Sequence, residues 1–194
     1  MRIQVIHCHP LEDSFNHALF RAVVETLRSN GHDVVATDLY REGFQPAMTE
    51  AERRTYMGNG YDDSAVARYA ETLTSVEGVV FCFPHWWFSM PAMLKGYFDR
   101  LFMPGVGFDI SDPAHVKPLL GHIRKVAGIS TYGRPRWRAI AMADPPRKMV
   151  KRYLRWYVGP RASVDYYALY HMNVATADQR DGFKSRVRTA MTRF

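Results

Sequence analysis

The chain has 194 residues and is basic, since 26 Lys and Arg against 19 Asp and Glu give a net charge of +7. Apolar residues make up 47% of it, which is ample for a core, and the length favours one domain spanning residues 1–194. No apolar run is long enough for a membrane span or a signal peptide, so we expect a cytoplasmic protein. The two cysteines, Cys8 and Cys82, exclude a disulfide framework; we expect buried thiols and no metal site.

The first forty residues follow a strand, loop, helix, strand pattern. Ile3 to Ile6 reads as a strand, and Ser14 is well suited to cap a helix that runs from Phe15 to Leu27. Gly31 suits the left-handed residue that ends such a helix. Residues 33–39 then read as a second strand, which makes a βαβ unit and predicts a parallel sheet with a right-handed crossover.

The middle of the chain contains a long connection and then a third strand. Residues 50–56 are expected to form a short helix, 57–63 a turn-rich stretch, and Ser64 to cap a helix that continues through Val76. Residues 79–83 are an apolar run typical of a strand buried on both faces, which Pro84 is expected to end because proline cannot donate to a ladder. An aromatic loop, 85–89, leads into a helix from Ala92.

The remainder supplies two further strands. We expect a turn at 104–108, an irregular stretch at 113–122, strands at 125–130 and 163–170, and helices at 145–158 and 176–194. Five strands alternating with helices indicate an α/β fold of flavodoxin-like type, with a parallel sheet in the order 2-1-3-4-5 and helices on both faces. In that order the loops 9–14 and 84–89 follow neighbouring strands, so they should meet at the carboxyl edge of the sheet.

Two loops carry residue types that suit a flat, phosphorylated ligand. His9, Ser14, Phe15 and Asn16 lead into a helix N-terminus, which offers N–H groups and a positive dipole end to a phosphate, although a plain helix cap explains the same residues. The loop lacks the glycine spacing of a P-loop or a dinucleotide fingerprint. The rings of the 85–89 loop either fold back onto the core as a lid or line a planar heteroaromatic cofactor.

The third strand, the aromatic loop and the helix after it resemble a known family. The pattern Phe83-Pro84-x-x-Trp87-Phe88-x-x-Pro91-Ala92-x-Leu94-Lys95-Gly96-Tyr97-Phe98-Asp99-Arg100 is similar to the flavin loop of the NAD(P)H:quinone oxidoreductases, the DT-diaphorase-like members of the flavodoxin-like superfamily. The resemblance covers about the first 110 residues well. It implies FAD as cofactor, with FMN as the alternative, and a homodimer with the active site at its interface. The cofactor-binding residues it implies are His9, Ser14, Phe15, Asn16, Pro84, His85, Trp86, Trp87, Phe88, Ser130, Thr131, Tyr132 and Gly133.

The segment after the fourth strand departs from that family. Ser130-Thr131-Tyr132-Gly133 stands where the family has Thr-Thr-Gly-Gly, and no histidine follows before His171, so the family's tyrosine and histidine pair is not carried over. Negative charge on a reduced flavin needs a nearby cation or donor. We therefore take Tyr132, Arg134 and Arg138 as candidate catalytic residues. The competing interpretation treats this arginine group, with Arg147, Lys148, Lys151 and Arg152, as a solvated basic face or an NADPH phosphate site.

The sequence therefore predicts a flavin-dependent NAD(P)H oxidoreductase that reduces a quinone or similar electrophile by two-electron hydride transfer in a ping-pong cycle. Three alternatives stay open. They are a flavodoxin-like electron carrier, a regulatory ancillary flavoprotein of a membrane transport system, and a nucleic-acid binder, although no recognition motif for nucleic acid is visible. The positive charge fits attraction to an anionic dinucleotide and to a negatively charged membrane surface alike. The sequence leaves the physiological acceptor and the choice between NADH and NADPH undecided.

Overall fold

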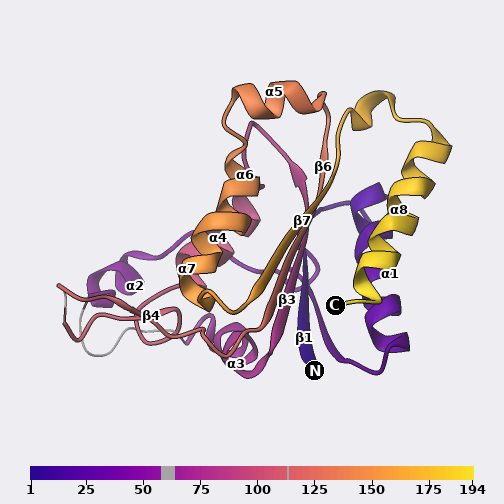
Figure 1. The fold of residues 1–194 in the computed structure, drawn as a ribbon. Coiled ribbons are helices and arrows are strands. Elements are labelled where there is room, and N and C mark those ends of the chain that lie inside the picture. The colour runs from indigo at the N-terminus through magenta and orange to yellow at the C-terminus, as the bar shows by residue number, and fades with distance from the viewer. Residues whose placement is uncertain (58–63, 113) are drawn as a thin grey trace.

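The computed structural model describes residues 1–57, 64–112 and 114–194 and has a parallel five-stranded sheet at its centre (Figure 1). The strand order is β2-β1-β3-β6-β7, which confirms the predicted order 2-1-3-4-5. All four pairings are parallel, so the five carboxyl ends lie at one edge. The strands are β1 (Arg2–His7), β2 (Asp33–Asp38), β3 (Gly78–His85), β6 (Lys125–Tyr132) and β7 (Ser163–Leu169).

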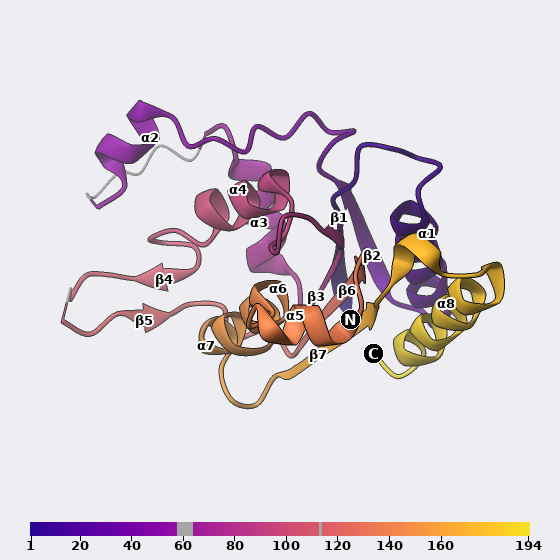
Figure 2. The same cartoon turned by 90° about the horizontal axis from the view of Figure 1, so that it is seen from above.

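Helices cover both faces of this sheet, as expected for an α/β fold (Figures 1 and 2). One face is covered by α1 (Phe15–Ser29) and α8 (Ala177–Met191), whose Leu19, Val23 and Val187 are fully buried. The other face is covered by α3 (Ala67–Ser75), α4 (Ala92–Leu101) and the segment after α5. Within the described ranges, no helix combines the length and the apolar character needed to cross a bilayer.

The helix caps on the α1 and α8 face follow from local sequence. The Ser14 hydroxyl accepts a hydrogen bond from the His17 N–H at 3.1 Å, so the predicted cap of α1 is confirmed. Gly31 has a φ of +78°, the left-handed conformation predicted for it. Thr176 and Gln179 form a capping box at the start of α8, each side chain accepting from the other's backbone N–H. The prediction for Ser64 is wrong, because α3 begins at Ala67 and Val66 occupies its cap position with no side-chain hydrogen bond.

Pro84 does not end the third strand, contrary to the sequence prediction. Strand β3 continues to His85, with Pro84 opposite Thr131 of β6. The Cys82 carbonyl accepts from the Cys8 N–H at 3.0 Å, so the backbone groups of residue 82 face β1. Two residues on, Pro84 faces the same side, but β1 pairs only as far as His7. The pairing of β1 with β3 therefore ends where the proline nitrogen, which has no hydrogen to donate, comes to face β1.

The connections differ from the predictions more than the sheet does. Helix α2 (Glu50–Thr55) matches the expected short helix, whereas most of the predicted turn at 57–63 lies outside the described residues. The segments 104–108 and 113–122, expected to be a turn and an irregular stretch, also contribute to the antiparallel two-residue strands β4 (Phe108–Asp109) and β5 (Lys117–Pro118). The structure adds α5 (Arg136–Ala141). The predicted helix 145–158 is three segments, namely α6 (Pro145–Lys148), the π-helical η1 (Met149–Tyr153) and α7 (Leu154–Val158).

Two helical glycines allow a matched test of this packing. A Cβ on Gly96 of α4 would lie 2.2 Å from the Pro46 carbonyl oxygen, whereas a Cβ on Gly182 of α8 meets nothing within 4 Å. We expect Gly96→Ala to lower the free energy of unfolding by about 1–3 kcal/mol through the forced backbone shift. Gly182→Ala should raise it by about 0.5–1 kcal/mol through reduced chain entropy. Urea unfolding of both variants checks the two opposite signs, and equal shifts would contradict the packing described.

Candidate functional site

A cleft of about 620 Å³ opens at the carboxyl edge of the sheet, above β1, β3 and β6. Its walls come from the loop after β1, the loop after β3, the end of β6 and the segment after β7. The two loops predicted to meet therefore do meet, and the rings of His9 and Trp86 lie 5.6 Å apart. The lining residues are His9, Ser14, Phe15, Asn16, Pro84, His85, Trp86, Trp87, Thr131, Gly133, Met172 and Asn173.

The aromatic wall stands on a tight and strained turn. The backbone N–H and carbonyl groups of Trp86 and Ser89 exchange two hydrogen bonds of 2.9 Å each, which leaves Trp87 and Phe88 at the corners. Both corner residues have positive φ, +46° and +57°, a conformation that turns of this kind normally reserve for Asn and Gly. Each such bulky residue costs on the order of 1–3 kcal/mol. Trp87 is 92% exposed, so the strain holds a large ring in solvent at the mouth of the cleft.

The opposite end of the cleft is built to receive negative charge. It is formed by the first turn of α1. The Ser14 hydroxyl accepts a hydrogen bond from the His17 N–H, and the N–H groups of Phe15 and Asn16, which have no acceptor within the helix, can donate to a ligand. The His9 Nδ1 accepts from the Leu11 N–H at 3.1 Å, so the neutral ring carries its proton on Nε2 as a free donor. Desolvation lowers the His9 pKa below its ordinary value, which favours the neutral ring.

Asn16, which lines the cleft between these ends, carries a buried oxygen that no described residue satisfies. Its Nδ2 donates to the Thr131 hydroxyl at 2.7 Å, which ties α1 to β6. Its Oδ1 is buried without a hydrogen-bond partner, which is rare because such an atom costs about 1–3 kcal/mol. A donor on a bound molecule would satisfy it.

The segment after β7 also reaches the cleft, which the sequence did not indicate. The His171 N–H donates to the Arg134 carbonyl at 2.9 Å, and this bond holds Met172 and Asn173 against the end of β6. A Cβ on Gly133 would lie 2.8 Å from the Asn173 Oδ1, so a larger residue there would force the Asn173 amide to move. Met172 and Asn173 belong to no sequence motif. They reach the cleft because β7 leads directly into η2 (Met172–Val174).

Several predicted site residues lie away from the cleft. Ser130 is fully buried, and the exposed Phe88 is not among the lining residues. The Tyr132 ring is also buried, and its hydroxyl donates to the Asp144 Oδ1 at 2.7 Å on the side away from the cleft. Its ring stacks on His85 with centroids 4.3 Å apart, so its contact with the site is indirect. Arg134 and Arg138 are exposed, and neither lines the cleft.

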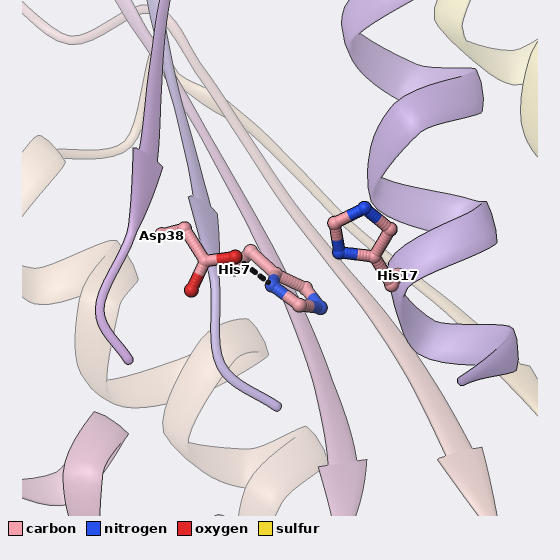
Figure 3. Close-up of side chains that lie close together, drawn as sticks. All are labelled: His7, His17 and Asp38. Carbon is pink, nitrogen blue, oxygen red and sulfur yellow. Dashed lines mark hydrogen bonds and ion pairs between the residues drawn. The ribbon is translucent and has the colours of Figure 1, made fainter. Parts of the chain in front are cut away.

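A cluster that the sequence analysis did not single out lies below the phosphate-facing end. His7, His17 and Asp38 place one potential metal-ligating atom each within 4.8 Å of the others (Figure 3). The His7 Nδ1 donates to the Asp38 Oδ2 at 2.9 Å, which joins the ends of β1 and β2 and holds the pKa of Asp38 below its usual range despite desolvation. The His7 Nε2 and the His17 Nδ1 are buried without partners.

The comparisons with known proteins agree with this architecture. A profile of the flavodoxin-like fold family matches residues 1–187. The chain belongs to that family. An uncharacterized NAD(P)H oxidoreductase of Escherichia coli, YcaK, is 34% identical over 109 residues, covering 55% of this chain and 55% of the relative. The ribosyldihydronicotinamide dehydrogenase [quinone] of Rattus norvegicus is 31% identical over 125 residues, 56% of this chain and 54% of that enzyme. The chain thus spans about half the length of these relatives.

Solved structures share the whole fold. A NAD(P)H:quinone oxidoreductase from Methanothermobacter marburgensis superposes with a TM-score of 0.81 at 23% identity, covering 99% of this chain and 98% of that one. A FMN-dependent NADH-azoreductase from Bacillus anthracis, solved in complex with FMN, gives a TM-score of 0.79 at 15% identity, covering 100% and 99% of the two chains. At sequence identities this low, the superpositions establish the common fold and nothing beyond it.

The strained turn yields a prediction in which stability and binding change in opposite directions. The double variant W87N/F88G places the residues that favour this turn at its corners. We expect its free energy of unfolding to rise by about 1–3 kcal/mol through relief of strain. Its affinity for FMN or FAD should fall at least tenfold through loss of the ring wall. Thermal unfolding and a flavin titration measure the two effects. The control Tyr153→Ala removes another exposed ring that does not line the cleft and should leave flavin affinity unchanged.

A second prediction concerns His9. Because its pKa is lowered in the free protein, a phosphate placed beside it should raise that pKa and draw in a proton. Binding of FMN should therefore strengthen as the pH falls from about 8 to about 6. Calorimetry in two buffers of different ionisation enthalpy measures the proton uptake. It should vanish in His9→Gln and for riboflavin, which has no phosphate. Equal uptake with riboflavin would contradict the role of His9.

Proposed function

We propose that the cleft binds a flavin and that the protein is a flavin-dependent NAD(P)H oxidoreductase that reduces quinones or related electrophiles. One observation carries the proposal: a strained aromatic turn and a free helix N-terminus face each other across a single cleft at the carboxyl edge of a flavodoxin-like sheet. A flat ring system that ends in a phosphate needs these two surfaces together. The named activities of the quinone-reducing relatives support the same assignment.

In this proposal different residues of the cleft contact different parts of the flavin. The first turn of α1, with the Nε2–H of His9, would hold the flavin phosphate. Trp86 and Trp87, with the backbone of their turn, would line the ring. The Asn16 Oδ1 would accept from a donor on the bound molecule. Phe88 and the buried Ser130 and Tyr132 would support this wall from behind.

The bound flavin supplies two-electron chemistry: NAD(P)H and a proton give NAD(P)⁺, and the electron pair and protons pass to a quinone to give a hydroquinone. The side chains of this protein orient the reactants and exclude water. Desolvation lowers the His85 pKa, so that His85 is a neutral ring at pH 7 which can donate a hydrogen bond to a quinone oxygen. In this proposal Arg134 and Arg138 are exposed beyond the end of β6. They supply positive charge near the site without contacting the flavin.

FAD is the proposed form of the flavin, with FMN as the alternative, because the His9 to Asn16 loop resembles the FAD-binding members of the quinone reductases. The proposal also includes a homodimer. Exposed rings that suit such an interface lie on α5 and α7, where Trp137 is 63% and Trp156 is 46% exposed.

The test measures flavin binding and turnover together. The purified protein is titrated with FAD and with FMN, followed by visible absorbance and by quenching of flavin fluorescence. It is then assayed for oxidation of NADH and NADPH with a benzoquinone. We expect saturable binding and turnover by a ping-pong rate law. Asn16→Ala should weaken flavin binding about tenfold, since it removes both the bond to Thr131 and the free acceptor.

The matched control is Asn30→Ala, which lies at the far end of α1 and bonds the Met191 carbonyl. This variant should bind flavin as the wild type does. A protein that takes up neither FAD nor FMN would contradict the proposal. A protein that binds flavin but passes electrons one at a time, without quinone turnover, would indicate an electron carrier instead.

A further inference from the structure

A second cleft, of about 490 Å³, lies behind the flavin cleft, on the other side of Tyr132. Helix α5 forms one wall, α6 and η1 form the other, and Tyr170 at the end of β7 closes one side. Five cations line it, which makes it the most basic of the clefts described. They are Arg136, Arg147, Lys148, Lys151 and Arg152.

Most of these cations form no ion pair with the carboxylates that the structure describes. Lys151 donates to the Val164 carbonyl and lies 4.0 Å from the Asp165 carboxylate. Among the described residues, the other four form no ion pair with a carboxylate. Asp144 is the one carboxylate in the lining, and its oxygens accept from the Tyr132 and Tyr170 hydroxyls at 2.7 and 3.4 Å. The cleft therefore holds an excess of positive charge that a polyanion would offset.

The backbone around this cleft is unusual in two independent ways. Helix α5 ends in two consecutive left-handed residues, Ala143 with φ +62° and Asp144 with φ +43°, where glycine is normally preferred. The next helical segment then becomes π-helical at η1, which carries Lys151 and Arg152. Both features cost stability, and both occur disproportionately at functional sites. Asp144 and four of the five cations belong to these two backbone features or to the segment between them.

Three stacked rings connect the two clefts. The Tyr132 ring lies between His85, which lines the flavin cleft, and Tyr170, which lines the basic one, with centroid distances of 4.3 and 4.6 Å. The clefts also share their bordering loops. Gly133 and Arg136 follow β6, and Tyr170 and Asn173 follow β7. The two clefts therefore border the same two chain segments, those after β6 and β7, and one extended molecule lying across these segments could contact both.

We propose that the basic cleft binds the 2′-phosphate of NADPH and so makes the protein select NADPH over NADH. This inference rests on the proposed function and names its electron donor. A phosphate monoester carries nearly two negative charges and accepts several hydrogen bonds, which suits paired arginines and lysines. The pyrophosphate of FAD fits less well, because the phosphate-facing end of the flavin cleft is at β1, and β3 separates β1 from β6.

The test compares two small probes by calorimetry, namely adenosine 2′,5′-bisphosphate and 5′-AMP, which differ by the 2′-phosphate. The wild-type protein should bind the bisphosphate at least tenfold more tightly. Arg152→Gln and Arg136→Gln, which change one exposed side chain on each wall, should each reduce this preference about tenfold, the loss of one charge-assisted hydrogen bond. Arg193→Gln is the control, since it removes an equal charge from a different cleft and should change nothing.

Kinetics give the second measurement. The ratio of kcat/KM for NADPH to that for NADH should exceed ten in the wild type and fall toward one in Arg152→Gln, with kcat/KM for NADH unchanged. Equal binding of the two probes by the wild-type protein would overturn the inference, even if NADH were oxidised rapidly. Selective binding of the bisphosphate without turnover of either dinucleotide would support the phosphate site and contradict the oxidoreductase assignment instead.

Discussion

The functional architecture of this protein depends on where its parallel strands stop. β1 ends at His7, opposite Cys82, whereas β3 and β6 run on in register to His85 and Tyr132. Because β1 is shorter at this edge, the last residues of β3 pair with β6 alone. The cleft opens on the side where β1 no longer pairs with them. A proline fits this geometry, because its nitrogen, which has no hydrogen to donate, faces the side on which the pairing with β1 ends. A sheet with flush ends would have no such opening between its first and third strands.

Two turns near the carboxyl edge are held in conformations that their residues disfavour. Trp87 and Phe88 form one and Ala143 and Asp144 the other, and each pair borders a different cleft. At on the order of 1–3 kcal/mol per residue, this strain is a sizeable part of the 5–15 kcal/mol by which a domain is typically stable. The core on both faces of the sheet offsets it. Strain placed at two clefts, and offset by packing elsewhere, is the pattern expected where geometry serves binding.

The two clefts also differ in the groups that would bind negative charge. The proposed flavin cleft would meet an anion with backbone N–H groups and with a histidine whose pKa is lowered by desolvation in the free protein. The basic cleft would meet one with permanent cations, four of which form no ion pair with a carboxylate of the described residues. Neutral donors in a fixed geometry suit a cofactor that stays bound, because they define its position. Free cations suit a ligand that must arrive quickly and leave, because attraction at long range speeds encounter.

The sequence by itself determined the order of the sheet, the caps of α1 and its turn at Gly31, and the meeting of the loops after β1 and β3. These follow from local patterns and from the few ways in which a parallel sheet can be connected. Tertiary structure alone decided that Tyr132 faces Asp144 instead of the cleft, that Met172 and Asn173 complete the site, and that the predicted helix 145–158 is interrupted. Each of these depends on contacts between segments far apart in the chain, such as the bond from His171 to Arg134, and no local pattern encodes such contacts.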